Sequence, residues 1–258
     1  MINVGVFRPT ECKWYLMSGR GVPGVWDAGI VYDGFGLSEY RDGKTVYLPS
    51  NYTTSDLYPL VGDWTGKGFD SIGVYREMST RFWLRNSNTP GAADLQIVYG
   101  SLGDIPLVGD WTGKGFDSIG VYRPSECKFY LRYSNTPGDA EEMIHFGDPR
   151  DVPLVGDWNG MGFDSVGVYR RDTRTFYLRT CNSYRIPYTK GTIAVTYGNP
   201  GDVPLVGDWM GNGIDSIGLY RPSERKFFLR SINTPGQATE AVIQYGNPGD
   251  TPVVGNWQ

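Results

Sequence analysis

The sequence predicts an all-β protein in which five copies of one four-stranded sheet close into a ring, and three observations support this. First, a phrase of the form PLVGDW recurs five times at intervals of 47, 47, 51 and 48 residues. Second, each unit holds four short strand-like stretches. Third, the two chain ends carry complementary parts of one unit. A repeat of this length with four strands is typical of a propeller blade, so we expect a five-bladed β-propeller.

The unit that starts at Pro106 shows the four strands in order. PLVGDW leads through a glycine turn, TGKGFD, to SIGVYR; a polar turn, PSEC, leads to KFYLR; and the loop YSNTPGDAEE leads to MIHFG. Alternation places Ile119, Val121 and Arg123 on one face of SIGVYR, and Gly120 and Tyr122 on the other. Both faces therefore carry bulky side chains, and such a sheet must be covered on both sides, as a blade is by its neighbours.

The chain ends predict how the ring closes. The sequence ends on PVVGNWQ, a first strand, and begins on INVGVFRPTECKWYL, a second and third strand. We expect the strand at 252–257 to pair with the strand at 3–8. The repeat units are then approximately 59–105, 106–152, 153–203, 204–251, and 252–258 joined with 1–58, in a single propeller domain over 1–258.

Composition excludes several classes of function. The net charge is −4 and acidic and basic residues are interspersed, which disfavours nucleic acid and anionic surfaces as partners. No stretch has the length of a membrane span, and the N-terminus enters strand-like sequence at once, without a signal peptide. His145 is the single histidine, which argues against a catalytic triad or a histidine-based zinc site. We expect no cofactor.

The three cysteines lack metal-type spacing. Cys12 and Cys127 occupy the same position in units that are not adjacent, which is too far apart for a disulfide. We expect free thiols, with a disulfide from Cys181 to another cysteine as the alternative.

The turn after the first strand reads GDWTGKGFDS at 62–71 and 109–118, GDWNGMGFDS at 156–165 and GDWMGNGIDS at 207–216. Together with the GVYRP of the second strand, these turns resemble the FG-GAP or VCBS-type repeat of integrin-like propellers, across all five units. In that family the turn has the pattern G-D-x-N-G-D-G-x-x-D, similar to a calcium loop. The resemblance implies a propeller fold and an extracellular or cell-surface location.

This sequence departs from the calcium pattern. The fifth turn position, Asp in the family, is Lys67, Lys114, Met161 or Asn212. A lysine ammonium there stands where the cation would sit, so we expect no metal, and the least unfavourable calcium ligands are Asp157, Asn159, Asp208 and Asn212.

The recurring residues of the turn are better interpreted as structural. The aspartates are expected to accept hydrogen bonds from turn amides, and the tryptophans to pack between blades. These residues are Asp63, Asp110, Asp157 and Asp208, with Trp64, Trp111, Trp158, Trp209 and Trp257.

Arginine ends the second strand of every unit and the third strand of four units. A ring of cationic sites for an acidic ligand is one interpretation. We favour ion pairs with a second recurring set of acids, namely Asp70, Asp117, Asp164 and Asp215.

Two segments break the repeat, at 17–44 and 180–191, both in connections between the third and fourth strands. The first segment mixes aromatic and acidic side chains in the way that suits stacking on sugar rings and hydrogen bonding to their hydroxyls. Its candidate ligand-binding residues are Trp26, Asp27, Tyr32, Asp33 and Tyr40. The equal alternative is an extra hairpin that stabilises the ring closure.

The near-identical units predict a non-enzymatic, lectin-like binding module for carbohydrate or another cell-surface ligand, with monomer as the expected state. The blade length and count are similar to those of tachylectin-type five-bladed lectins. The alternative is a structural or protein-interaction module of a larger surface protein. A glycoside hydrolase with Asp63, Asp110, Asp157, Asp208 and Asn256 around a central cavity is less favoured, because equivalent carboxylates do not separate into acid and base.

Overall fold

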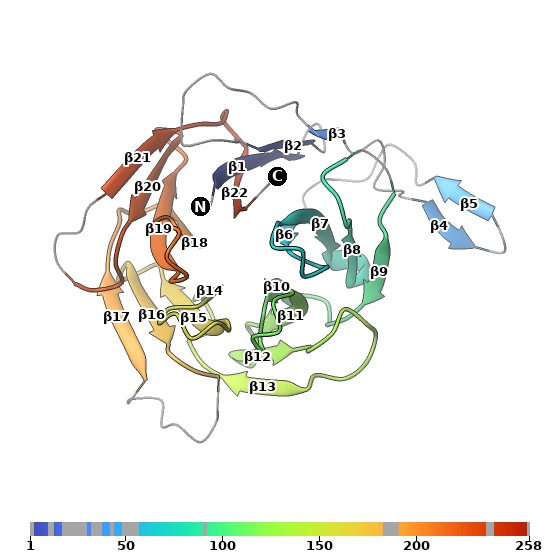
Figure 1. Cartoon of the computed structure of the whole chain (residues 1–258), viewed down its shortest axis with the longest axis horizontal. Helices are drawn as coiled ribbons and strands as arrows, with labels where there is room; N and C mark the ends of the chain where they lie inside the picture. The colour runs from blue at the N-terminus through green and yellow to red at the C-terminus, as the bar shows by residue number, and fades with distance from the viewer. Residues whose placement is uncertain are drawn as a thin grey trace.

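The computed structural model describes residues 3–9, 13–16, 30–31, 38–41, 44–47, 57–89, 92–182, 191–235 and 240–256. It is all-β, with five four-stranded antiparallel sheets arranged around a ring (Figure 1). The predicted five-bladed propeller is thereby confirmed. No helix in the described part of the chain is long and apolar enough to cross a membrane.

Each blade runs from an innermost to an outermost strand. Blade 1 consists of β22 (Thr251–Gly255), β1 (Asn3–Arg8), β2 (Lys13–Leu16) and β3 (Ile30–Val31). Blade 2 consists of β6 (Leu57–Gly62), β7 (Ser71–Arg76), β8 (Arg81–Leu84) and β9 (Leu95–Val98), with a 3-10 helix, η3 (Glu77–Ser79), between β7 and β8. Blade 3 consists of β10 (Ile105–Gly109), β11 (Ser118–Arg123), β12 (Lys128–Leu131) and β13 (Glu142–His145). Blade 4 consists of β14 (Val152–Gly156), β15 (Ser165–Arg170), β16 (Thr175–Arg179) and β17 (Thr192–Thr196), and blade 5 of β18 (Val203–Gly207), β19 (Ser216–Arg221), β20 (Lys226–Arg230) and β21 (Glu240–Gln244).

The two ends of the chain meet in blade 1, as the half-repeats predict. Strand β22 pairs antiparallel with β1, and Val4 lies opposite Val254. Val253 packs with Phe7, Trp14 and Leu16 in one buried cluster. The last strand is therefore an integral part of the first blade.

The core is divided into five clusters, each of which joins one blade to the next. In one cluster Tyr75 and Phe82 of blade 2 pack against Ile119 and Val121 of blade 3. The same arrangement recurs at the other four junctions. Both faces of the middle strands are therefore buried between blades, which explains why those strands are apolar on both sides.

A glycine in the second strand of the blade is required by close packing. A Cβ added at Gly73 would lie 2.8 Å from the Leu84 side chain and 3.1 Å from the Trp83 carbonyl oxygen, and the Trp64 ring lies 3.3 Å away. Trp64 is buried, as are its counterparts Trp111 and Trp158. The recurrent Gly and Trp thus form one packing unit; Trp257 lies outside the described residues.

Blade 1 differs from the spacing-based expectation. The spacing of the repeat predicts that Tyr47 follows the fourth strand of this blade, as Tyr99 does in blade 2. In the structure the fourth strand is Ile30–Val31, which pairs with Lys13–Trp14, and Tyr47 ends a separate hairpin of β4 (Ser38–Arg41) and β5 (Lys44–Tyr47). Two parts of the insertion form strands, and the part that comes first after β2 in the chain joins the blade. Part of the extra segment is therefore a hairpin, and its role in stabilising the ring closure stays a prediction.

Candidate functional site

The glycine-rich turns after the innermost strands are organised by the first recurring aspartate. Asp63 accepts hydrogen bonds from the amides of Thr65, Lys67 and Gly68, at 3.1, 3.1 and 2.6 Å. Asp110, Asp157 and Asp208 accept the corresponding amide bonds in their own turns. These are the hydrogen bonds that the Asx-turn interpretation predicts.

The turns do not fit calcium. The oxygens of Asp157 and Asp208 are directed at turn amides, the Asn212 side chain accepts from Ile214, and the Asn159 amide donates to Thr180. The described residues contain no group of three or more His, Cys, Asp or Glu side chains that could hold a metal ion. The calcium loop that the family resemblance implies is therefore replaced by a turn closed through amide hydrogen bonds.

The second recurring aspartate links neighbouring blades. The amide of Asp63 donates to Asp117 Oδ2 at 2.7 Å, and the amide of Asp117 donates to the Asp63 carbonyl at 2.8 Å. Desolvation raises the pKa of Asp117 to about 8, with a further contribution from the nearby carboxyl of Asp70. The same reciprocal pair recurs in Asp110 with Asp164, Asp157 with Asp215, and Asn256 with Asp70.

The expected partners of the arginines at the end of the second strand were wrong. Arg123 binds Asp104, with Nε and Nη2 2.8 and 2.9 Å from its two carboxylate oxygens, and not Asp117. Arg170 pairs in the same way with Asp151, Arg221 with Asp202, and Arg8 with Asp250. The true partner is the buried aspartate of the link that leads into each innermost strand, because the second strand ends beside that link.

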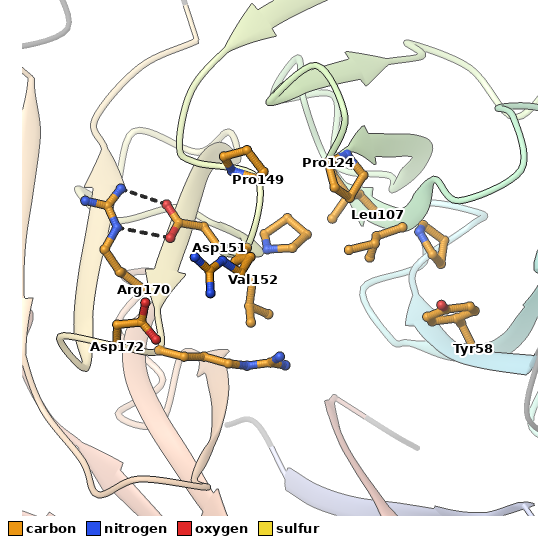
Figure 2. Close-up of a pocket in the computed structure, with 13 residues that line it drawn as sticks. Tyr58, Leu107, Pro124, Pro149, Asp151, Val152, Arg170 and Asp172 are labelled. Carbon is orange, nitrogen blue, oxygen red and sulfur yellow. Dashed lines mark hydrogen bonds and ion pairs between the residues drawn. The ribbon is translucent and has the colours of Figure 1, made fainter.

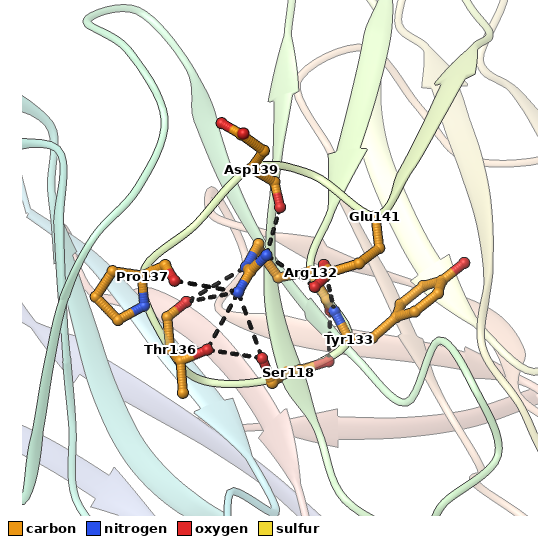
Figure 3. A network of polar contacts seen from close by, with 8 residues as sticks. Ser118, Arg132, Tyr133, Thr136, Pro137, Asp139 and Glu141 are labelled. Atoms are coloured by element: carbon orange, nitrogen blue, oxygen red, sulfur yellow. Dashed lines mark hydrogen bonds and ion pairs between the residues drawn. The ribbon is translucent and has the colours of Figure 1, made fainter.

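The arginines that end the third strand organise the following loop. Arg132 donates to the carbonyls of Thr136, Pro137 and Asp139 and to the Glu141 carboxylate (Figure 3). The loop thus closes around one side chain, and Arg132 is not free for a ligand. Asp139 turns its carbonyl toward Arg132, while its carboxylate has no hydrogen-bond partner in the described part of the chain.

A cleft between blades 2 and 3 brings together the features expected of a small-molecule site. One wall is a row across blade 3, where Val121, Tyr130 and Met143 lie side by side in register. Tyr130 carries the Arg123 guanidinium over its ring at 4.6 Å and donates to Glu126 at 2.7 Å. Met143 is 63% exposed.

Blade 2 and the Arg132 loop complete this inter-blade cleft. Val98, Tyr99 and Gly100 form the opposite wall, and Gly138, Asp139 and Ala140 form an edge. The cleft has a volume of about 540 Å³, within the range of roughly 300 to 1,000 Å³ that small-molecule sites span. It combines apolar surface with one free carboxylate and exposed backbone.

The pairing of arginine with an aromatic ring recurs around the propeller. The guanidinium lies 4.3 to 5.0 Å from the ring centre in Arg8 with Tyr15, Arg170 with Tyr177, and Arg221 with Phe228. Each of these pairs occupies the position of Arg123 and Tyr130 in its own blade. The arginine and aromatic part of this wall is therefore present in four blades, whereas the position of Met143 is Gln96, Ala194 or Val242 in blades 2, 4 and 5.

Most of the ligand-binding residues proposed from the sequence lie outside the described residues. Trp26, Asp27, Tyr32 and Asp33 are among them, and of Tyr40 the structure describes its place in β4 but no side-chain contact. Of the segment 180–191, residues 183–190 also lie outside. Cys127 and Cys181 are free thiols, and Cys12 is not among the described residues.

Three residues of the inter-blade cleft were not predicted as site residues, namely Tyr130, Asp139 and Met143. Asp139 gave a signal, because it stands where the preceding unit has Ala92, within otherwise matching NTPG loops. Tyr130 gave none, since an aromatic residue at this position recurs in every unit and is equally consistent with packing.

No family model matches the chain, and no curated protein matches it. Among solved structures, the chain is similar to an Agrocybe aegerita lectin described as recognising non-reducing terminal N-acetylglucosamine, with 14% identity and a TM-score of 0.46. The match covers 93% of this chain and spans 64% of the length of the lectin chain. An identity this low carries no inference about the ligand.

Proposed function

We propose that the protein is a non-enzymatic carbohydrate-binding propeller that holds a sugar ring in the inter-blade cleft. The observation that carries the proposal is the set of residues that line one cleft of about 540 Å³: the partly exposed Tyr130 ring, the exposed Met143, and Asp139, whose carboxylate has no partner among the described residues. A sugar ring offers apolar C–H faces and hydroxyl donors at its rim. Tyr130, Met143 and Val98 suit the faces, and Asp139 suits a pair of hydroxyls.

Repetition of the arginine and aromatic pair in four blades favours recognition over catalysis. Four junctions share the arginine and aromatic pair, so a ligand with repeated sugar units meets several similar surfaces on one molecule. Linked weak contacts of this kind raise the overall avidity well above that of one site.

The acids near the cleft are not arranged for glycoside hydrolysis. Hydrogen bonds from Tyr130, Arg123 and Lys128 lower the pKa of Glu126 to about 2, which keeps it ionised and unsuited to proton donation. The turn aspartates Asp63 and Asp110 accept amide hydrogen bonds in equivalent surroundings. Acid and base roles require carboxyl groups in unlike environments.

Binding to a glycan array, followed by calorimetry with the best neutral sugar, tests the proposal. Asp139→Ala introduces the residue that blade 2 carries at this position, so the loop is retained while the acceptor is lost. We expect affinity to fall at least about tenfold in Asp139→Ala, because charge-assisted hydrogen bonds are lost, and also in Tyr130→Ala, because stacking area is lost. Lys114→Asn, which introduces the residue of the blade 5 turn, is the control and should bind as the wild type does.

Two results would count against this function. One is an array without hits combined with capture of a defined protein partner, which would favour the protein-interaction alternative. The other is sugar binding that Asp139→Ala and Tyr130→Ala leave unchanged, which would place the site elsewhere.

A further inference from the structure

A second cavity lies at one mouth of the central channel, where the innermost strands begin. Its walls come from Tyr58 of β6, Ile105–Leu107 of β10 and Pro149–Pro153 before and in β14, with Arg170–Asp172 at one side. Figure 2 shows Tyr58 across the cavity from Arg170 and Asp172. Pro106, Leu107 and Pro153 also line the channel, so this mouth pocket is continuous with it. It shares no lining residue with the inter-blade cleft.

The mouth pocket collects residues that break the repeat. Arg150 stands where the other links have Gly103, Gly201 and Gly249. Arg171 stands where three other units have Pro9, Pro124 and Pro222, and Tyr58 stands where three units have Ile105, Val152 and Val203. These three residues line one cavity. The fold does not require them, because the other blades form with different residues at the same positions.

The charges of the pocket leave two arginines available. Arg170 is held by Asp151, with contacts of 3.1 and 2.9 Å (Figure 2). Arg170 also forms an ion pair with Asp148. Arg150 and Arg171 are exposed, and within the described residues neither guanidinium has an ion pair or hydrogen bond to a side chain. The pocket lining also includes Asp151, which is bound to Arg170, and Asp172. The three arginines and the carboxylates of Asp148, Asp151 and Asp172 balance in formal charge, but two of the three guanidinium groups have no carboxylate partner among the described residues.

The remaining walls are apolar. Leu107, Val152 and several prolines line a volume of about 570 Å³, with the Tyr58 ring at the far side. A bare inorganic anion leaves this surface uncovered. An organic carboxylate can place its charged group on the arginines, because the guanidinium fork matches a planar carboxylate. The rest of the molecule then contacts the prolines and the Tyr58 ring.

We propose that the mouth pocket binds a small organic carboxylate of the size of one sugar residue, with a uronic acid as the representative ligand, through the guanidinium groups of Arg150 and Arg171. The proposal is independent of neutral-sugar binding in the inter-blade cleft, because the two sites have separate walls.

A titration of isotope-labelled protein with glucuronate, followed by amide NMR shifts, tests the proposal. We expect the amides of Ile105 and Val152 to shift with glucuronate, and not with glucose at the same concentration. Arg150→Gly and Arg171→Pro introduce the residues of the sister blades and should each weaken glucuronate binding at least about tenfold. Arg171→Gln removes the charge without a change of backbone preference and provides a second variant. Lys114→Asn removes one positive charge from a turn outside the pocket and should bind glucuronate as the wild type does.

Three results would overturn the proposal. Equal shifts with glucose would show that the carboxylate is not recognised. Equal affinity for acetate or sulfate would show a response to charge alone, without the organic body. Unchanged glucuronate binding in both Arg150→Gly and Arg171→Gln would place the anion elsewhere.

Discussion

The amide of Asp63 donates to the carboxylate of Asp117 in the next blade, and the amide of Asp117 donates in return to the carbonyl of Asp63. This reciprocal pair recurs at three further junctions and ties each blade to the next near the channel. Each pair buries one carboxyl group between two blades, and burial disfavours the charged form of that group.

These acids make stability depend on pH. Desolvation raises the pKa of Asp70 and Asp215 to about 6 and that of Asp117 to about 8, all above the ordinary 3.8. The folded protein therefore holds these protons more tightly than the unfolded chain does. The stabilisation is complete below the ordinary pKa and is lost as pH rises through the folded values. We expect the free energy of unfolding, measured with urea, to fall by about 2 kcal/mol or more between about pH 5 and about pH 8.

Asp117→Asn is the matched variant for this effect. It retains an oxygen to accept from the Asp63 amide and removes the ionisable group. We expect it to be at least as stable as the wild type at about pH 8 and to show a smaller fall with pH. A wild-type stability that is constant or rises over this range would contradict the assignment.

Two equivalent tyrosines differ in one hydrogen bond. Tyr122 donates through its hydroxyl to the Asp148 carbonyl at 3.1 Å, whereas the Tyr75 hydroxyl is buried without a partner among the described residues. Blade 1 has Phe7 at this position. Thermal unfolding should show Tyr122→Phe less stable by about 1 kcal/mol, and Tyr75→Phe unchanged or more stable. Equal losses in both variants would show that the two hydroxyls are equally satisfied.

Ring closure through the last strand predicts a long-range effect. Hydrogen exchange should show the amides of β1 protected to the same degree as those of β11. Val253→Asp places a charge in the cluster with Phe7 and Trp14, so it should accelerate exchange in β1 and lower stability by about 3 kcal/mol or more. Rapid exchange in β1 of the wild type would contradict closure.

The fold could be predicted from sequence because the same strand pattern is repeated in each unit. An error in assigning the strands of one unit is corrected by comparison with the other units. Val4 and Val254 could be paired by aligning the half-repeats. The partner of Arg123 could not be predicted, because Asp104 and Asp117 recur with the same period and spacing does not distinguish them. The fourth strand of blade 1 was misplaced because its insertion has no sister segment for alignment.

The candidate sites could not be predicted from the sequence as well as the fold could. The long insertion at residues 17–44 predicted a site there. The mouth pocket instead depends on single residues, such as Arg150 and Arg171, that differ from their counterparts in otherwise regular units. That these positions meet in one cavity depends on which strand ends and links surround the channel, and this is visible only in three dimensions.

Methionine methyl groups provide the most direct test of the proposed sugar site. Met143 lies in the inter-blade cleft, while Met78, Met161 and Met210 are similarly exposed elsewhere. In a titration of methyl-labelled protein with the best neutral sugar from the array, we predict a saturable shift of the Met143 methyl signal and unchanged signals from the other three. A sugar that binds without moving the Met143 signal, or that moves all four equally, would contradict carbohydrate recognition in this cleft.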